Sequence, residues 1–318
     1  MASEEPPETL AGVGEFAVID RLVAGRNQPD AVALGPGDDA AVVLARDGAT
    51  VVSTDMLVEG RHFRLDWSSP HDVGRKAIAQ NAADIEAMGA ASTAFVVAFG
   101  APGDTPAAQA VELADGMWHE ARLLGAGIVG GDLVTAPQWV ISVTALGDLG
   151  GREAVRLGGA RAGDAVAVVG ALGWSAAGYA LVLNGIQDFD TLRRRHSVPE
   201  PPYGQGRVAA DAGATSMTDV SDGLVADLGH IARASGVGID LSSDSLGAGL
   251  DPLTSAGAAL AVDPWNWILG GGEDHALVAT FPGPPPDGWR VIGRVLDGPA
   301  KVLVDGQSWR GQAGWQSF

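Results

Sequence analysis

Acidic and hydroxyl side chains stand beside two short hydrophobic runs early in the chain. Residues 35–55 read G-P-G-D-D-A-A-V-V-L, then a polar gap, then T-V-V-S-T-D. Asp38 and Asp39 precede the first run, and Ser53, Thr54 and Asp55 end the second. If the runs are neighbouring antiparallel strands, these carboxylates crowd one end of a sheet. Each repulsion at about 4 Å then costs roughly 1 kcal/mol in water and about 4 kcal/mol at a partly buried position. A bound cation would relieve it, and all-oxygen ligands suit Mg²⁺, Ca²⁺ or Mn²⁺ rather than zinc or copper.

The same pattern, an acid beside a glycine or at the edge of an apolar run, recurs along the chain. The acids are Asp39, Asp55, Asp84, Asp132, Asp219, Asp222 and Glu273. In layered α/β folds ligands collect where strands pass into loops. Each acid taken singly is typical of a turn, so the pattern leaves turns and a shared metal site both open.

Asp84 is the most informative of these acids. It lies in an Ala-rich segment, residues 72–88, which predicts a helix that Gly89 ends. Asn81 and Asp84 share a face of that helix, and the face is otherwise small and apolar. A carboxylate buried there needs a partner, which is either a shared metal or a salt bridge to Arg75 or Lys76.

Ser221 and Asp222 have both a structural and a functional interpretation. Serine is a favoured helix N-cap, and an acid in the first turn complements the helix dipole. The same helix start is also a potential phosphate site. Arg156 is either a surface residue or a bidentate phosphate clamp. Glu273 lies in G-G-G-E-D, a backbone suited to close approach.

Two further residues have mainly structural interpretations. His62 is typical of a loop histidine, and Trp315 of a packing anchor rather than a stacking platform. Familiar motifs are missing from the sequence: it has no G-x-x-x-x-G-K-[ST], no H-E-x-x-H and no EF-hand loop. The glycines at 125, 127 and 130 spell G-x-G-x-x-G, but they follow a predicted helix and lead into a strand, the reverse of the dinucleotide-binding order.

Composition bounds the class of protein. The 318 residues are 46% hydrophobic and 19% charged, with 46 glycines, which predicts a folded chain with many tight turns. The net charge of −19 opposes binding to nucleic acid or an anionic membrane. Because there is no cysteine, disulfides and thiolate chemistry are excluded. The N-terminus is acidic and proline-bearing, unlike a signal peptide, and no apolar run approaches the length of a membrane span, so we expect a cytoplasmic protein.

Strands and helices alternate in both halves, which predicts an α+β fold of mixed α/β layers. The double glycine at 150–151 suggests a boundary between domains at 1–150 and 151–318. We expect helices at 15–23, 72–88, 106–124, 175–183 and 204–212, and a further helix that the T-D-V-S-D-G-L motif (218–224) opens and that runs to about residue 235. We expect strands at 40–46, 49–55, 92–100, 139–146, 164–169, 238–241, 276–281, 289–295 and 301–304, a loop at 56–63 and a turn at 129–132.

Seven motifs, in order and spacing, resemble the thiamine-monophosphate kinase family across nearly the whole chain. They are G-D-D-A (37–40), S-T-D (53–55), G-R-H-F (60–63), K-A-I-A-Q-N-A-A-D-I-E-A-M-G-A (76–90), G-G-D (130–132), D-V-S-D-G-L (219–224) and G-G-E-D (271–274). The resemblance implies a two-domain aminoimidazole ribonucleotide synthetase-like fold and a homodimer formed through the sheet of the N-terminal domain, which binds ATP and Mg²⁺. It further implies Mg²⁺-dependent phosphorylation of thiamine monophosphate by ATP.

The resemblance also implies roles for individual residues. Metal-binding positions match Asp39, Ser53, Thr54, Asp55, Asp84, Asp132, Asp219 and Asp222. ATP-contacting positions match Gly131, Asp132, Arg156 and Ser221, and positions that contact the thiamine substrate match His62, Glu273 and Trp315. No residue is expected to act as acid, base or nucleophile, because the acceptor phosphate is already ionised near neutral pH.

The chain departs from the family pattern at two places. The C-terminus reads G-W-Q-S-F in place of the commoner G-x-D-H-F, and His275 replaces the usual aromatic residue after G-G-E-D. Two other functions stay open. One is a different ATP-using enzyme of the superfamily, such as aminoimidazole ribonucleotide synthetase, and the other is a non-catalytic protein that binds divalent metal.

Overall fold

The computed structural model describes residues 8–36, 40–311 and 314. The chain divides into two compact units within which the contacts concentrate. Unit 1 comprises Met1–Asn81 and Ser92–Asp148, and unit 2 comprises Ala82–Ala91 and Leu149–Phe318. The division therefore passes through a helix of the first half, and the last turns of that helix belong with the second half of the chain. None of the helices in the described ranges is long and apolar enough to cross a membrane.

The first half of the chain contains four helices and six strands among the described residues. They are α1 (Leu10–Val13), α2 (Glu15–Val23), β1 (Val32–Leu34), β2 (Val42–Val43), β3 (Val51–Val58), α3 (Pro70–Ala87), β4 (Ala91–Ala101), α4 (Ala107–Leu123), β5 (Gly127–Thr135) and β6 (Val140–Asp148).

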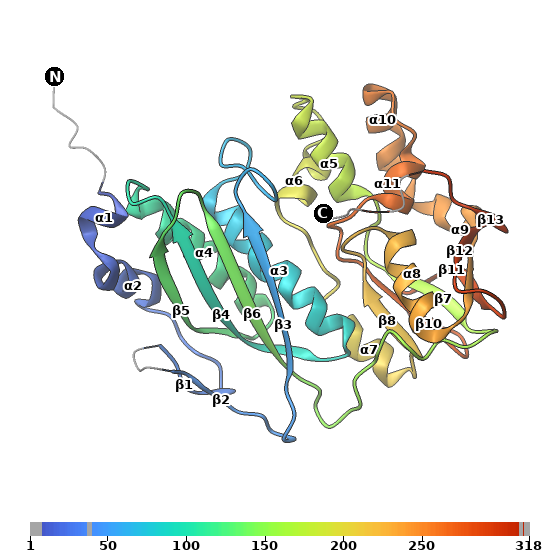
Figure 1. Cartoon of the computed structure of the whole chain (residues 1–318), viewed down its shortest axis with the longest axis horizontal. Helices are drawn as coiled ribbons and strands as arrows, with labels where there is room; N and C mark the ends of the chain where they lie inside the picture. The colour runs from blue at the N-terminus through green and yellow to red at the C-terminus, as the bar shows by residue number, and fades with distance from the viewer. Residues whose placement is uncertain (1–7, 37–39, 312–313, 315–318) are drawn as a thin grey trace. The chain divides into compact units, whose positions relative to one another are not determined.

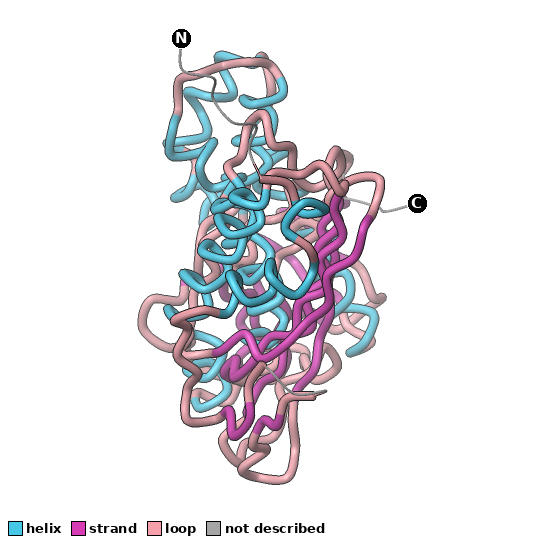
Figure 2. The backbone as a smooth tube through the Cα atoms, turned by 90° about the vertical axis from the view of Figure 1, so that its left-hand side faces the viewer, coloured by secondary structure: helices cyan, strands magenta, loops and turns pink. Residues whose placement is uncertain are grey.

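The main sheet of unit 1 has the strand order β3-β6-β4-β5, and α3 and α4 cover one face of it (Figure 1). The same layering of strands against helices is visible from the side in Figure 2. α3 and α4 cross at Gly74 and Gly116, where a Cβ atom would lie within 2.1 Å and 1.9 Å of backbone oxygens of the other helix. On the opposite face β3 exposes Val52 and Met56, 58% and 51% accessible.

Two expectations for this half are wrong. β2 does not pair with β3 but forms a separate two-stranded sheet with β1, while β3 pairs antiparallel with β6. β3 also continues to Val58, into the segment expected to be a loop.

Unit 2 is built on a larger sheet in the order β13-β12-β9-β11-β7-β10-β8. Its elements are β7 (Ala165–Val169), α5 (Trp174–Leu183), α6 (Asp190–Ser197), α7 (Gln205–Asp211), β8 (Ser216–Asp219), α8 (Leu224–Ser235), β9 (Gly238–Leu241), α9 (Ser243–Leu246), η1 (Gly247–Gly249), α10 (Asp251–Leu260), α11 (Pro264–Gly270), β10 (Leu277–Phe281), β11 (Arg290–Leu296), β12 (Val302–Val304) and β13 (Gln307–Ser308). All strand pairs are antiparallel except β12 with β9.

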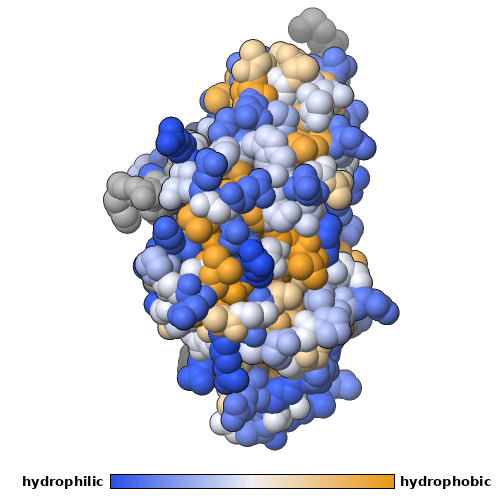
Figure 3. Space-filling view, turned by 90° about the vertical axis from the view of Figure 1, so that its right-hand side faces the viewer, coloured by the Kyte–Doolittle hydropathy of each residue, from blue (hydrophilic) through white to orange (hydrophobic). Residues whose placement is uncertain are grey.

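Apolar clusters cover both faces of this sheet. One cluster joins Val166 and Val278 to residues of α5, α8 and α11, including Leu181, Leu228 and Ile268. A second cluster covers the other face and includes Ala87 at the end of α3 and Ala209 of α7. Strands buried on both faces read as continuous hydrophobic runs, and this is why A-V-A-V-V and L-V-A-T-F predict strands directly. On the side shown in Figure 3, apolar side chains gather near the middle, among hydrophilic ones.

Candidate functional site

In unit 1, Asp55 lies on the helix-covered face of the sheet. Its partner in β6 is Val143, which is 1% accessible. The side chain of Asn81, on α3, accepts a hydrogen bond from the backbone N–H of Asp55 (2.9 Å), and the amide of Gln80 donates to Asp55 Oδ2 (3.4 Å). Ser53 shares this face because it is two residues away on the same strand. Thr54 faces the other way, and its hydroxyl donates to the carbonyl of Val143 (2.9 Å).

Gly131 and Asp132 lie within β5, the edge strand opposite β3, so the expectation of a turn at 129–132 is wrong. Asp132 pairs with Ala98 of β4. Ala98 and Val96 are two residues apart on this strand and are both exposed, so they lie on the same, exposed face. Paired residues share a face, so Asp132 lies on the face opposite to the one that carries Asp55. Unit 1 therefore does not bring Asp132 and Asp55 together. Asp39 lies outside the described residues, as does Trp315.

His62 follows the end of β3 in a tight turn. Its Nδ1 accepts the backbone N–H of Val58 (3.0 Å), and its carbonyl accepts a hydrogen bond from Lys76 Nζ (3.1 Å). Because Nδ1 is an acceptor, the ring hydrogen of a neutral His62 is on Nε2. This tautomer leaves a donor on the outer side of the ring.

In unit 2, two segments rich in predicted site residues lie side by side. The backbone N–H of Val220 donates to the carbonyl of Ala276 (2.7 Å), that of His275 to Val220 (2.9 Å), and that of Glu273 to Ser221 (2.8 Å). These bonds continue the β8–β10 ladder, in which Asp219 is opposite Leu277. We name residues 219–223 and 271–276 the paired loops. A Cβ on Gly272 would lie 2.3 Å from the carbonyl oxygen of Ser221, so glycine is required for this approach.

His275 contacts Asp219 inside the paired loops. Its Nδ1 is 2.9 Å from Asp219 Oδ2, and both side chains are buried. Burial alone would lower the pKa of His275, but the hydrogen bond and charge of Asp219 raise it, helped by the charges of Glu273 and Asp84. Asp84 on α3 therefore lies close enough to the paired loops to interact electrostatically with His275. Three of the predicted acids, Asp84, Asp219 and Glu273, thus act electrostatically on one imidazole, and Asp219 is also hydrogen-bonded to it.

Asp227 is a site residue that the sequence did not suggest. It is buried in the first turn of α8, and its carboxylate accepts the backbone N–H groups of Asp222 (3.1 Å) and Gly223 (2.9 Å). Burial raises the pKa of Asp227 to about 7, and the negative charge of Asp219 adds to the shift. Ligand atoms of Asp222, Asp227 and His230 lie within 4.8 Å of one another.

The assignment of Ser221 as a helix N-cap is wrong. The N-cap of α8 is Gly223, without a side-chain cap, and Asp227 occupies the N–H groups of the two residues that lead into the helix. The negative charge of a carboxylate at this position would repel a phosphate bound at the same helix N-terminus. Arg156 is exposed just before β7, and its carbonyl accepts the backbone N–H of Met217 in β8 (3.3 Å).

Glu273 and Asp274 leave the paired loops in different directions. Glu273 has a positive φ of 62°, a backbone strain that proteins concentrate at functional sites. One of its carboxylate oxygens is 3.4 Å from Nδ1 of the buried His196. Asp274 instead accepts the backbone N–H groups of Gly173 (2.5 Å) and Ser175 (2.8 Å) at the start of α5.

The chemistry of these groups fits a divalent cation. Asp219, Asp222 and Asp227 supply carboxylate oxygens, the ligands that Mg²⁺ prefers, and their mutual repulsion contributes to the raised pKa of Asp227. The guanidinium of Arg75, one of the two salt-bridge partners suggested for Asp84, pairs with Glu120 at 2.7 Å. A cation near the paired loops would relieve the repulsion.

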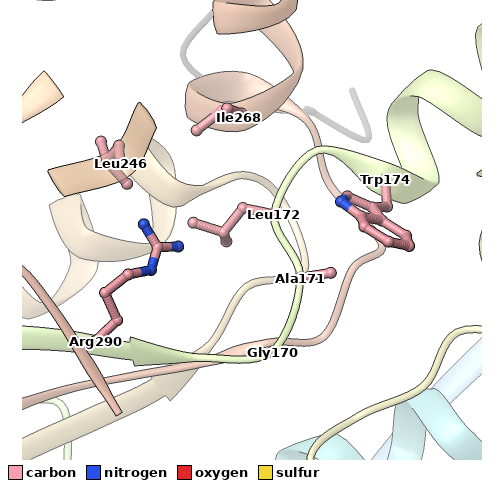
Figure 4. Close-up of a pocket in the computed structure, with 7 residues that line it drawn as sticks. All are labelled: Gly170, Ala171, Leu172, Trp174, Leu246, Ile268 and Arg290. Atoms are coloured by element: carbon pink, nitrogen blue, oxygen red, sulfur yellow. The ribbon is translucent and has the colours of Figure 1, made fainter. Parts of the chain in front are cut away.

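A separate cavity of about 260 Å³ opens at the end of β7 (Figure 4). The guanidinium of Arg290 points into it beside Leu172 and Leu246, and donates to the carbonyl of Ser245 (2.5 Å). The cavity is lined by Gly170, Ala171, Leu172, Trp174, Leu246, Ile268 and Arg290. None of the predicted site residues that the structure describes is among them, so the acids of the paired loops do not line this cavity.

Comparison with known proteins first defines the class. Residues 37–149 match the N-terminal domain of AIR synthase related proteins, and residues 161–267 match the C-terminal domain. The solved complex of AaThiL with AMPPCP and TMP is similar to this chain, with a TM-score of 0.78 and 30% identity, covering 99% of this chain and 100% of that one. The chain thus has the two-domain AIR synthase-like fold, as the motifs predict.

The particular family follows from the curated relatives. The chain is 70% identical to the thiamine-monophosphate kinase of Mycobacterium tuberculosis, over 100% of this chain and 95% of that protein. It is 37% identical to that of Escherichia coli, over 85% and 83%. The chain belongs to the thiamine-monophosphate kinase family, and the resemblance noted from its motifs is confirmed.

Proposed function

We propose that this protein transfers the γ-phosphoryl group of ATP to thiamine monophosphate and forms thiamine diphosphate and ADP. The observation that carries the proposal is the pairing of the segment of Asp219 and Asp222 with that of Glu273, in a chain 70% identical over its full length to a thiamine-monophosphate kinase. Similarity to a protein that holds AMPPCP and TMP supports the same pair of substrates.

The step is a direct in-line transfer. An ionised oxygen of the thiamine phosphate attacks the γ-phosphorus, and the bond from this phosphorus to the bridging oxygen of ADP breaks. Because the acceptor oxygen carries no proton to remove, no general base is needed. When bound, Mg²⁺ would screen the charges of the two substrates and of the leaving ADP.

Residues of each unit contribute to this proposal. In unit 2, Asp84, Asp219 and Asp222 are the proposed metal ligands, with Asp227 beside them. Arg156 and Ser221 are proposed to contact ATP, and Glu273 the thiamine. In unit 1, the proposed ligands are Ser53, Thr54, Asp55 and Asp132, with Gly131 as an ATP contact and His62 as a thiamine contact. Asp39 and Trp315 keep the metal and thiamine roles that the resemblance implies.

A substrate panel tests the proposal. Purified protein with ATP and Mg²⁺ should release ADP with thiamine monophosphate, and much less with thiamine or with the substrate of aminoimidazole ribonucleotide synthetase. ³¹P NMR should show the diphosphate product, and EDTA should abolish it. Labelled ATP without acceptor should leave no phosphate on the protein. If the protein turned over only the aminoimidazole precursor, it would be the other enzyme of the superfamily. If it turned over none of these substrates, it would be a non-catalytic protein that binds divalent metal.

We further propose a homodimer formed through the sheet of unit 1. The sheet face without helices exposes apolar residues on three strands, namely Val52, Met56, Val96 and Val134, and such faces are typical of subunit interfaces. Asp132 lies on this same face, where a second subunit would cover it.

The double substitution Val52→Asp, Met56→Glu should convert the dimer to a monomer, because it places two charges on an apolar face that the partner would cover. Light scattering on a sizing column should give twice the 32.3 kDa chain mass for the wild type and the single mass for the variant. Leu123→Glu, on α4 and equally exposed at 58%, is the matched control and should stay dimeric. A dimeric double variant would place the interface elsewhere.

A further inference from the structure

His275 is the one histidine of the paired loops. Its backbone position is fixed independently of its side chain. The N–H of His275 donates to Val220, and the next residue, Ala276, accepts from Val220. These backbone hydrogen bonds therefore place the ring of His275 beside Asp219, the last residue of β8. A phenylalanine here would keep the backbone bonds and lose the polar contact.

The contact between His275 and Asp219 determines which atom donates the hydrogen bond and which accepts it. A carboxylate only accepts, so Nδ1 of His275 carries the hydrogen and donates it to Asp219 Oδ2 at 2.9 Å, whether or not the ring is charged. Within the described residues Asp219 Oδ1 has no hydrogen bond, and Asp219 is 6% accessible. One oxygen of Asp219 is thus held and the other is not.

We propose that His275 is a positioning residue for divalent-cation binding: it holds Asp219 by Oδ2 so that Oδ1 is presented to the ion. The proposal rests on the proposed function for the choice of ion, and goes beyond it in assigning the residue that orients the ligand. Hydrogen-bond partners of metal ligands commonly change metal affinity by about 10–100-fold when removed.

A purely structural role is the competing explanation. In that case the buried pair only stabilises the paired loops, and its removal lowers the stability of the protein in EDTA without changing the affinity of the folded protein for metal. Two substitutions separate the explanations. His275→Phe removes the donor and keeps a ring. His275→Asn retains a donor close to the place of Nδ1, and asparagine tolerates the positive φ of 53° found here.

The test measures binding of Mn²⁺ alone to the full-length protein by EPR, without nucleotide, together with thermal unfolding in EDTA. We expect His275→Phe to weaken Mn²⁺ binding roughly tenfold, and His275→Asn to bind within about threefold of wild type. In the Asp219→Ala background, His275→Phe should have no further effect, because there is no carboxylate to orient. Equal Mn²⁺ affinity in wild type and His275→Phe would overturn the proposal, as would equal losses in the two His275 variants.

This measurement is independent of turnover. If the wild type binds Mn²⁺ with the expected ranking of variants but forms no thiamine diphosphate, the proposed function fails and the role of His275 stands. If it forms thiamine diphosphate while the variants do not differ in Mn²⁺ binding, the role of His275 fails alone.

Discussion

Replacing Asp84 with asparagine should lower turnover of thiamine monophosphate by roughly 10²–10³-fold, the loss typical of removing one group that stabilises transferring charge. The side chain sits on α3 among residues of unit 2, close enough to His275 to raise its pKa. Asparagine keeps the shape and one oxygen but loses the negative charge that a cation requires. The saturating Mg²⁺ concentration should rise together with the loss of rate, since the ligand charge is reduced.

The fold should tolerate this substitution. The end of α3 is held in unit 2 by Glu86, whose carboxylate accepts the backbone N–H groups of Gly204 (2.9 Å) and Gly206 (3.0 Å), and these bonds do not involve Asp84. Circular dichroism and the unfolding midpoint in EDTA should therefore match wild type closely. Glu112→Gln, an exposed carboxylate on α4, is the control and should leave turnover unchanged. Unchanged turnover in Asp84→Asn would remove this residue from the site.

Elements with strong local patterns could be predicted from the sequence. α2 and β9 were expected at the residues where they occur, and β7, β10 and β12 to within one residue. Of these strands, β7 and β10 are largely buried on both faces, so burial selects apolar residues at most of their positions. α3 was recognised because alanine favours helix and Gly89, at φ 75°, ends it.

Pairing and edge strands could not be predicted in the same way. Nothing in V-V-L or V-V-S-T-D specifies a partner, and β3 pairs with β6, about ninety residues later, rather than with its neighbour β2. Gly130, Gly131 and Asp132 have low strand propensity, yet they form part of edge strand β5, where Gly131 fits because a Cβ would lie 1.9 Å from the carbonyl oxygen of Val97. A tertiary contact overrides local preference there.

The roles assigned to the site residues stay predictions, and their arrangement could not be derived from the sequence. Asp84, Asp219 and Glu273 all act electrostatically on His275, whereas Asp132 lies on the sheet face opposite to Asp55. Asp227 was missed because an acid in the first turn of a helix is ordinary. Its significance comes from the two N–H groups that it accepts and from nearby carboxylates, which only the folded chain brings together.

Asp274 should make the stability of the protein depend on pH between about 4 and 7. Burial raises the pKa of this carboxyl to about 7, although the N–H groups of Ser175 and Gly173 and the charge of His275 oppose the shift. In the unfolded chain the pKa of an aspartate is near its ordinary value of 3.8. Between these two pH values the folded state holds one more proton than the unfolded state. The free energy of unfolding therefore falls as pH rises, by about 1.4 kcal/mol per pH unit for this group.

Asp274→Asn should flatten this dependence. Asparagine does not ionise. The unfolding free energy, measured by urea unfolding, should therefore fall less steeply with pH between 4.5 and 6.5, because the contribution of about one proton to the slope is removed. The variant should also be less stable at pH 5, by about 1–3 kcal/mol, since one of the N–H groups at the start of α5 loses its acceptor. Asp263→Asn, which makes the same change at the exposed N-cap of α11 and keeps an acceptor there, is the matched control.

The prediction for Asp274 is tested by the slope of the unfolding free energy against pH, and not by the unfolding free energy at a single pH. Asp227 and Glu86 also have raised pKa values through burial, so the wild-type slope contains more than one proton and Asp274→Asn should reduce it without abolishing it. If Asp274→Asn lowers stability equally at every pH, the carboxylate is ionised in the folded protein throughout this range. In that case the two N–H groups at the start of α5 lower the pKa of Asp274 more than burial raises it. The carboxyl groups of Asp227 and Glu86 must then account for any remaining pH dependence of stability.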